Sequence, residues 1–308
     1  MPELILHHYE ISPFSAKIRA MLGYCDLPWQ SARTAPLPPR PGVDTLTGGY
    51  RRIPAAQLGA DVFCDSRLIG EEVAAMAGRP ELSLAQADDA QRELATRAEL
   101  EVFFACVSKA AGWPLLRRVI ADYGPVTLFR TLRDRAGMTR SMNEPRLQKR
   151  GPGGDVNGYL DDLEALLVAD FLFGDQPTIA DFAAWHCLWF ATEVGGRNLA
   201  ARLPRVQAWM QTVAAFETVP TEELSADQVL AIAGSCEPRE LPADIGEDDL
   251  LGKPVTIGPA DYATDTVTGI LVASQPDRFI LRRDTLTTGT VHVHFPRERF
   301  AVTSAAGR

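Results

Sequence analysis

The 308-residue sequence lacks the features that would place it in a membrane or direct it out of the cell. No apolar run approaches the roughly 20 residues that a transmembrane helix needs. The N-terminus carries Glu3 and the pair His7–His8, without the basic start and apolar run of a signal peptide. We therefore expect a cytoplasmic protein with no membrane partner.

Cysteine is scarce, odd in number and scattered, and no CxxC pair or metal-type spacing occurs. This pattern predicts neither a disulfide framework nor a cysteine metal site, but reduced and mostly buried thiols. The five cysteines are Cys25, Cys64, Cys106, Cys187 and Cys236.

Basic residues are outnumbered, with 31 Lys and Arg against 40 Asp and Glu, which gives a formal net charge of −9. That balance disfavours nucleic acid or an anionic membrane as a partner. The apolar share of 46% and the charged share of 23% are ordinary for a globular protein. A chain of this length can bury a sizeable core and predicts two or three domains.

The most informative segment is residues 12–19, SPFSAKIR, which follow the apolar run 4–6. A small hydroxyl residue, Ser12, then stands where a predicted strand gives way to a helix, and Pro13 suits the first helical turn. Exposed N–H groups and the macrodipole favour an anion at such a position, and a thiolate there has a lowered pKa. Alternatively, Ser12 only caps the helix.

A second segment, residues 51–69, predicts a β-hairpin followed by a helix. It begins RRIPAAQL, turns through Gly59 and enters a helix at Asp65-Ser66. Proline is tolerated at the start of a strand, and Asp and Ser are favoured helix caps. Read alone, Asp65 and Ser66 serve equally well as cap or as ligand-binding pair.

The order strand, SPF helix, long loop, Ile-Pro hairpin and Asp-Ser helix resembles the N-terminal domain of glutathione transferases. A second block, residues 171–182 (FLFGDQPTIADF), resembles their helical domain, with Thr178 and Asp181 spaced as a capping box. The resemblance implies an α/β thioredoxin-like domain at 1–78 and an all-α helical-bundle domain at 87–234. It also implies glutathione as co-substrate, no bound cofactor, and a two-fold homodimer.

The resemblance also assigns roles to the two segments. Ser12 would donate a hydrogen bond to the glutathione sulfur, with Tyr9 as the competing hydroxyl. Ile53, ahead of Pro54, would offer its backbone to the cysteinyl residue, as an added strand does. Asp65 would take the γ-glutamyl ammonium and Ser66 its carboxylate. Arg51 or Arg52 either reaches the glycyl carboxylate or faces solvent. Because serine cannot form a mixed disulfide, redox chemistry through a protein thiol is not expected there.

The remaining chain predicts helices and a β-rich tail. The proline-rich residues 35–49 predict an irregular surface loop. Candidate aromatics for an electrophile pocket are assigned no individual role; they are Phe103, Phe104, Trp113, Trp185 and Trp189. Helical patterns cover residues 88–106, 126–136, 158–170, 178–192, 203–217 and 225–234.

The tail has no counterpart in ordinary glutathione transferases, which end in helices. Its short runs at 254–257, 267–273, 279–283, 290–295 and 300–303 predict a small antiparallel β module within 251–308. Since so few residues can hardly form a core alone, we expect the module to pack against the helical domain. His292 and His294 share a strand face, which predicts a solvated face rather than a metal site.

These observations predict an enzyme that adds glutathione thiolate to a small hydrophobic electrophile. Glutathione-dependent peroxidase or isomerase chemistry at the same site is one alternative. The other is a non-catalytic glutathione-fold module whose tail docks a partner.

Overall fold

The computed structural model describes residues 3–140, 155–261 and 263–305, and the side chains of 135–140 are outside the description. The N-terminal part has the thioredoxin-like order that the sequence predicts. Strand β1 pairs in parallel with β2 on one side and antiparallel with β3 on the other, and β3 forms an antiparallel hairpin with β4. Its elements are β1 (Leu4–His8), α1 (Pro13–Tyr24), β2 (Trp29–Arg33), α2 (Pro41–Thr47), β3 (Ala55–Leu58), β4 (Asp61–Cys64) and α3 (Ser66–Ala77).

The prediction of an irregular surface loop over residues 35–49 is wrong, because α2 forms inside it. Pro41 begins the helix, where its missing N–H is harmless. Gly48 ends it with a φ of 80° and donates its N–H to the carbonyl of Asp44, a left-handed cap that glycine favours. Val43 and Leu46 are buried, so α2 belongs to the core.

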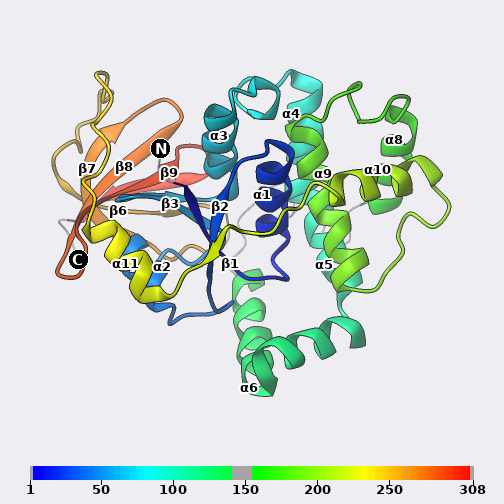
Figure 1. Ribbon diagram of the computed structural model, residues 1–308, viewed down its shortest axis with the longest axis horizontal. Coiled ribbons are helices and arrows are strands. Elements are labelled where there is room, and N and C mark those ends of the chain that lie inside the picture. The colour runs from blue at the N-terminus through cyan, green and yellow to red at the C-terminus, as the bar shows by residue number, and fades with distance from the viewer. Residues whose placement is uncertain (1–2, 141–154, 262, 306–308) are drawn as a thin grey trace.

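The helical part confirms each predicted helix, with shifted ends. The long α6 contains a non-helical residue at Gly124, before Pro125, and extends away from the sheet (Figure 1). The elements are η1 (Pro80–Leu82), α4 (Asp89–Arg97), η2 (Ala98–Val102), α5 (Phe103–Ala110), α6 (Trp113–Arg140), α8 (Val156–Leu166), α9 (Ile179–Trp189), η3 (Phe190–Val194) and α10 (Pro204–Ala214).

The capping box at the start of α9 is confirmed. Oδ2 of Asp181 accepts from the backbone N–H of Thr178 at 2.8 Å and from its hydroxyl at 3.1 Å. Oδ1 accepts from Leu172 N–H and from Trp209 Nε1. Burial raises the pKa of Asp181, against the effect of these hydrogen bonds. The cap thus also ties α9 to α10, within the core shared with α1 and α3.

The tail forms the predicted strands, but it joins the N-terminal part through strand pairing, and of the predicted helical domain the helix Ala226–Gly234 packs against it. Strand β9 pairs in parallel with β4 of the N-terminal part, with His292 opposite Asp61. One ten-stranded sheet results, in the order β10-β6-β7-β8-β9-β4-β3-β1-β2-β5. The further elements are β5 (Glu222–Glu223), α11 (Ala226–Gly234), β6 (Pro254–Pro259), β7 (Val267–Ser274), β8 (Arg278–Thr285), β9 (Gly289–Pro296) and β10 (Phe300–Ser304).

Burial explains why the tail extends the sheet. The five tail strands, β6 to β10, cannot bury their apolar face by themselves. Without the tail, β4 would be an unpaired edge strand of the N-terminal sheet. The tail strands share a core with Ile5, Tyr50 and Val62 of the N-terminal part and with Val229 of α11. Strands β7–β9 therefore lie at one end of the molecule and the helical part at the other, with β1–β3 between them (Figure 1).

In the described parts of the chain, no helix combines the length and the apolar character needed to span a bilayer.

Candidate functional site

One pocket gathers the predicted glutathione-binding residues at the edge of the N-terminal part. It holds a cavity of about 50 Å³. The loop before β3, the start of α3, the η2 turn and two turns of the tail all contribute to it. Its lining residues are Phe14, Tyr50, Arg52, Ile53, Pro54, Asp65, Ser66, Arg67, Glu99, Leu100, Asp261, Glu298 and Arg299.

The loop before β3 is held by a buried arginine. The Ile53–Pro54 peptide is cis, and both residues line the pocket. Arg40 is 2% exposed and donates to the carbonyl oxygens of Tyr50 at 2.7 Å and Arg51 at 3.0 Å, while its Nε donates to Asp44. A charged group buried this deeply is stabilised only when its donors are satisfied. Arg40 was missed in the sequence because nothing distinguishes it from a loop arginine.

Asp65 acts as the helix cap and also faces the pocket. Its Oδ1 accepts from the backbone N–H of Arg67 at 3.0 Å. Its φ of 76° is costly for a residue with a Cβ and persists only where the surroundings enforce it. Ser66, the first residue of α3, is 5% exposed and stands where backbone N–H groups favour an anion.

Arg52 does not face solvent, so that alternative is wrong for this residue. Its side chain is 11% exposed and forms an ion pair with Asp65 at 3.5 Å and a close hydrogen-bonded pair with Asp261. Asp261 is 4% exposed and comes from the loop after β6. Arg51 pairs with Asp134 and Asp265 and is not among the lining residues. The tail therefore contributes charge to the pocket.

The two candidate hydroxyls do not line this pocket. Ser12 is 1% exposed, and its Oγ accepts from the N–H of Ser15 at 3.3 Å as the cap of α1. Tyr9 is half-buried and packs against Val43 and Ile53. Phe14, two residues after Ser12, does line the pocket.

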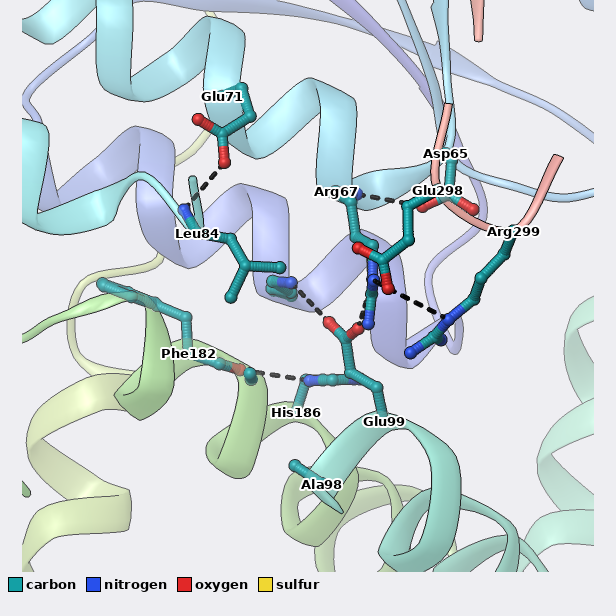
Figure 2. A network of polar contacts seen from close by, with 12 residues as sticks. Asp65, Arg67, Glu71, Leu84, Ala98, Glu99, Phe182, His186, Glu298 and Arg299 are labelled. Carbon is teal, nitrogen blue, oxygen red and sulfur yellow. Dashed lines mark hydrogen bonds and ion pairs between the residues drawn. The ribbon is translucent and has the colours of Figure 1, made fainter. Parts of the chain in front are cut away.

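A cluster of buried ion pairs contributes Glu99 and Arg67 to the lining of the pocket (Figure 2). Glu99 accepts from Lys17 Nζ at 2.7 Å and from Arg67 Nε at 2.9 Å. Burial raises the pKa of Glu99, but these two cations outweigh it and hold the pKa far below its usual range. Sequence analysis missed Glu99 because it lies 82 residues from Lys17, a separation that no local pattern reveals.

Four of the five cysteines carry thiols that burial makes hard to ionise. Cys64, Cys106 and Cys187 are buried, as predicted for most of them. Burial raises the pKa of Cys106 to about 12 and that of Cys25 to about 11, and it also raises those of Cys64 and Cys187. None of these four thiols is therefore activated as a nucleophile.

The predicted solvated face of His292 and His294 is wrong for His294. That residue is 5% exposed, and its ring stacks on Phe63 with centroids 4.5 Å apart. Within residues 3–140, 155–261 and 263–305, no group of acidic, histidine and cysteine side chains is arranged to hold a metal.

The candidate aromatics occupy different environments. Phe103 contacts the lining residue Phe14, with ring centroids 4.8 Å apart. Trp185 is fully buried and donates to the carbonyl of Met210, whereas Trp113 is 70% exposed. Of these three, Phe103 lies best to meet an apolar group beside the pocket.

Two segments of the chain match known protein families. The family described as "Glutathione S-transferase, N-terminal domain" matches residues 6–81, and "Glutathione S-transferase, C-terminal domain" matches residues 154–212. Among functionally curated proteins no match was found.

Among solved structures, a GST-like protein from Pseudomonas syringae is 30% identical, with a TM-score of 0.75 over 98% of this chain and 99% of that one. Such coverage includes the tail strands. A glutathione S-transferase from Rhodospirillum rubrum F11 is 19% identical, over 68% of this chain and 87% of that one, with a TM-score of 0.49. One from Methylobacillus flagellatus KT, solved with GSH bound, is 15% identical over 70% and 100%, with a TM-score of 0.45.

Proposed function

Because the chain belongs to the glutathione S-transferase family, we propose that it binds glutathione in the pocket between β3, α3 and the tail. The bound thiolate then attacks a small hydrophobic electrophile. The observation that carries the proposal is that Arg52, Ile53, Pro54, Asp65 and Ser66 line one pocket. These are the residues that the family pattern assigns to glutathione.

Three of these residues contact glutathione directly in the proposed mechanism. The backbone of Ile53 binds the cysteinyl residue, Asp65 binds the γ-glutamyl ammonium, and Ser66 binds its carboxylate with its N–H at the start of α3. The Ser12 hydroxyl turns from its cap to donate to the sulfur, with Tyr9 as the competing donor. Thiolate stabilisation and orientation of the electrophile supply the rate gain.

The proposal includes a cytoplasmic homodimer. The family pattern supports the dimer, and the cysteine content supports the reducing compartment. Because β9 already pairs with β4, the two subunits do not join their sheets at that edge. Light scattering at micromolar concentration tests the dimer. A measured mass of 33.6 kDa, which is that of one chain, would contradict it.

A second candidate is a non-catalytic binding module, because the small cavity leaves little room for an electrophile beside glutathione. The cavity of about 50 Å³ is far below the roughly 300–1,000 Å³ typical of ligand pockets. Glutathione must therefore displace the ion pair between Arg52 and Asp261 or shift the tail turns.

A substrate panel separates these functions. Electrophiles, peroxides and isomerisable substrates are assayed with glutathione, alongside glutathione binding by calorimetry. Conjugation of at least one electrophile supports the transferase, and turnover confined to peroxides or isomerisation supports those chemistries. Binding without turnover of any class favours the module, and no glutathione binding overturns all three.

A further inference from the structure

The α3 end of the pocket carries an arginine whose donors are incompletely used. The side chain of Arg67 is 10% exposed, and its Nε donates to Glu99 while its Nη1 lies 2.9 Å from Glu298. Its Nη2 is buried and has no hydrogen-bond partner among the described residues. A buried guanidinium N–H without an acceptor is costly, so this donor is available to a ligand.

A second arginine reaches the same place from the tail. Arg299 lies in the turn between β9 and β10 with a φ of 65°, a conformation that costs a non-glycine residue free energy. Its side chain is 17% exposed, and Nε lies 3.5 Å from Glu298. Burial and the nearby charge of Arg67 both lower the pKa of Arg299. Figure 2 shows the two guanidinium groups converging above Glu99.

Basic groups gather at this end of the pocket. Lys17, Arg67 and Arg299 face Glu99 and Glu298, and the charges of Asp65 and Asp261 also act on the two arginines. The first N–H groups of α3 lie beside them and also favour an anion. A planar carboxylate matches the fork of a guanidinium group, which can donate to both of its oxygens.

We propose that Arg67 and Arg299 bind the α-carboxylate of the γ-glutamyl group, so that the tail supplies a specificity-determining residue to the pocket. This inference rests on the proposed function, because it names how the bound thiol peptide is recognised. The ammonium on the same carbon then lies toward Asp65, which is two residues before Arg67 in the chain. The β extension thereby selects ligands that end in an amino-acid group.

The test compares glutathione with the analogue that lacks the α-carboxylate, γ-aminobutyryl-cysteinyl-glycine. Arg299→Met removes the guanidinium and keeps the apolar stem. It should weaken glutathione binding about tenfold and leave the affinity for the analogue, already weaker in the wild type, unchanged. Arg282→Met is the matched control, because Arg282 lies on β8 with a side chain 47% exposed; it should change neither affinity.

Melting temperatures of both variants show whether the fold is intact. Arg299→Met leaves behind Glu298, whose side chain is 64% exposed, so little destabilisation is expected. Wild-type glutathione affinity in Arg299→Met, or an equal loss for both ligands, overturns the inference and leaves the proposed function standing. Failure of the wild type to bind glutathione overturns the proposed function, and the inference with it.

Discussion

The Nε2 atom of His294 lies 2.8 Å from Oδ1 of Asp61 and joins β9 to β4 at the point where the tail meets the N-terminal part. Asp61 is 1% exposed and also accepts from the backbone N–H of Arg239. Burial raises its pKa, but the hydrogen bonds from His294 and Arg239 prevail and lower it. The bond crosses between segments 233 residues apart.

Replacing this histidine should destabilise the whole chain. His294→Ala removes the hydrogen bond and the stack on Phe63 and leaves a buried carboxylate less satisfied. We expect a loss of about 2–3 kcal/mol in the free energy of unfolding, measured with urea. His292→Ala, two residues away and half-buried, is the control and should cost well under half as much. Equal losses would show that the junction of β9 with β4 does not depend on the hydrogen bond between His294 and Asp61.

Buried neutral histidines should make the protein acid-sensitive. Burial, the largest cause in each case, lowers the pKa of His7 to about 4, of His8 to about 3 and of His186 to about 4. Because the unfolded chain binds these protons near the ordinary pKa of about 6.5, stability is full above that pH and falls below it. The loss at pH 5 should be about 2 kcal/mol for each histidine.

Urea unfolding at pH 7 and pH 5 measures this loss. Burial raises the pKa values of Asp181 and Glu217. These two carboxyl groups therefore stabilise the fold as the pH falls, which opposes the effect of the histidines. A His186→Asn variant isolates the histidine contribution and should show a smaller fall than the wild type. Unfolding free energies independent of pH between 7 and 5 would show that these histidines titrate normally.

Local patterns predicted most of the fold because its elements are encoded locally. The tail strands alternate, and Thr178 and Asp181 satisfy their capping groups within one helical turn. The helix α2 was missed because four prolines obscured a seven-residue helix whose stability comes from burying Val43 and Leu46. The docking of the tail was missed because strand pairing between distant segments leaves no periodic signal.

The candidate site was predicted only as far as the family pattern reaches. That pattern includes Ile53, Pro54, Asp65 and Ser66, and these residues do line one pocket. Asp261, Glu298 and Arg299 come from a tail outside the pattern, so no comparison of spacing could place them there. The pocket depends on side chains that converge from distant turns.

Removing the tail should expose the core that it shares with the N-terminal part. A chain ending at Gly246 leaves the β4 edge unpaired and uncovers Tyr50 and Val62, which are buried against tail residues. We expect aggregation, or a melting temperature lower by well over 10 °C. A monodisperse truncated chain with an unchanged melting temperature would contradict the shared core.

The sulfur donor can be identified by comparing two substitutions. Ser12→Ala should lower kcat by about 10²-fold or more if its hydroxyl stabilises the thiolate, and it should cost about 1 kcal/mol of stability through the lost helix cap. Tyr9→Phe should leave kcat within a few-fold of the wild type. Full activity of Ser12→Ala together with an inactive Tyr9→Phe would transfer the role to Tyr9.

The central claim is that the ligand of this pocket is glutathione, with its ammonium on Asp65. Calorimetric titration of the wild type and Asp65→Asn with glutathione and desamino glutathione tests it most directly. Asparagine is a good helix cap, so the variant keeps the start of α3. We predict at least tenfold weaker glutathione binding by the variant and little change for desamino glutathione, which lacks the ammonium. Equal affinities of wild type and variant for glutathione would contradict the account.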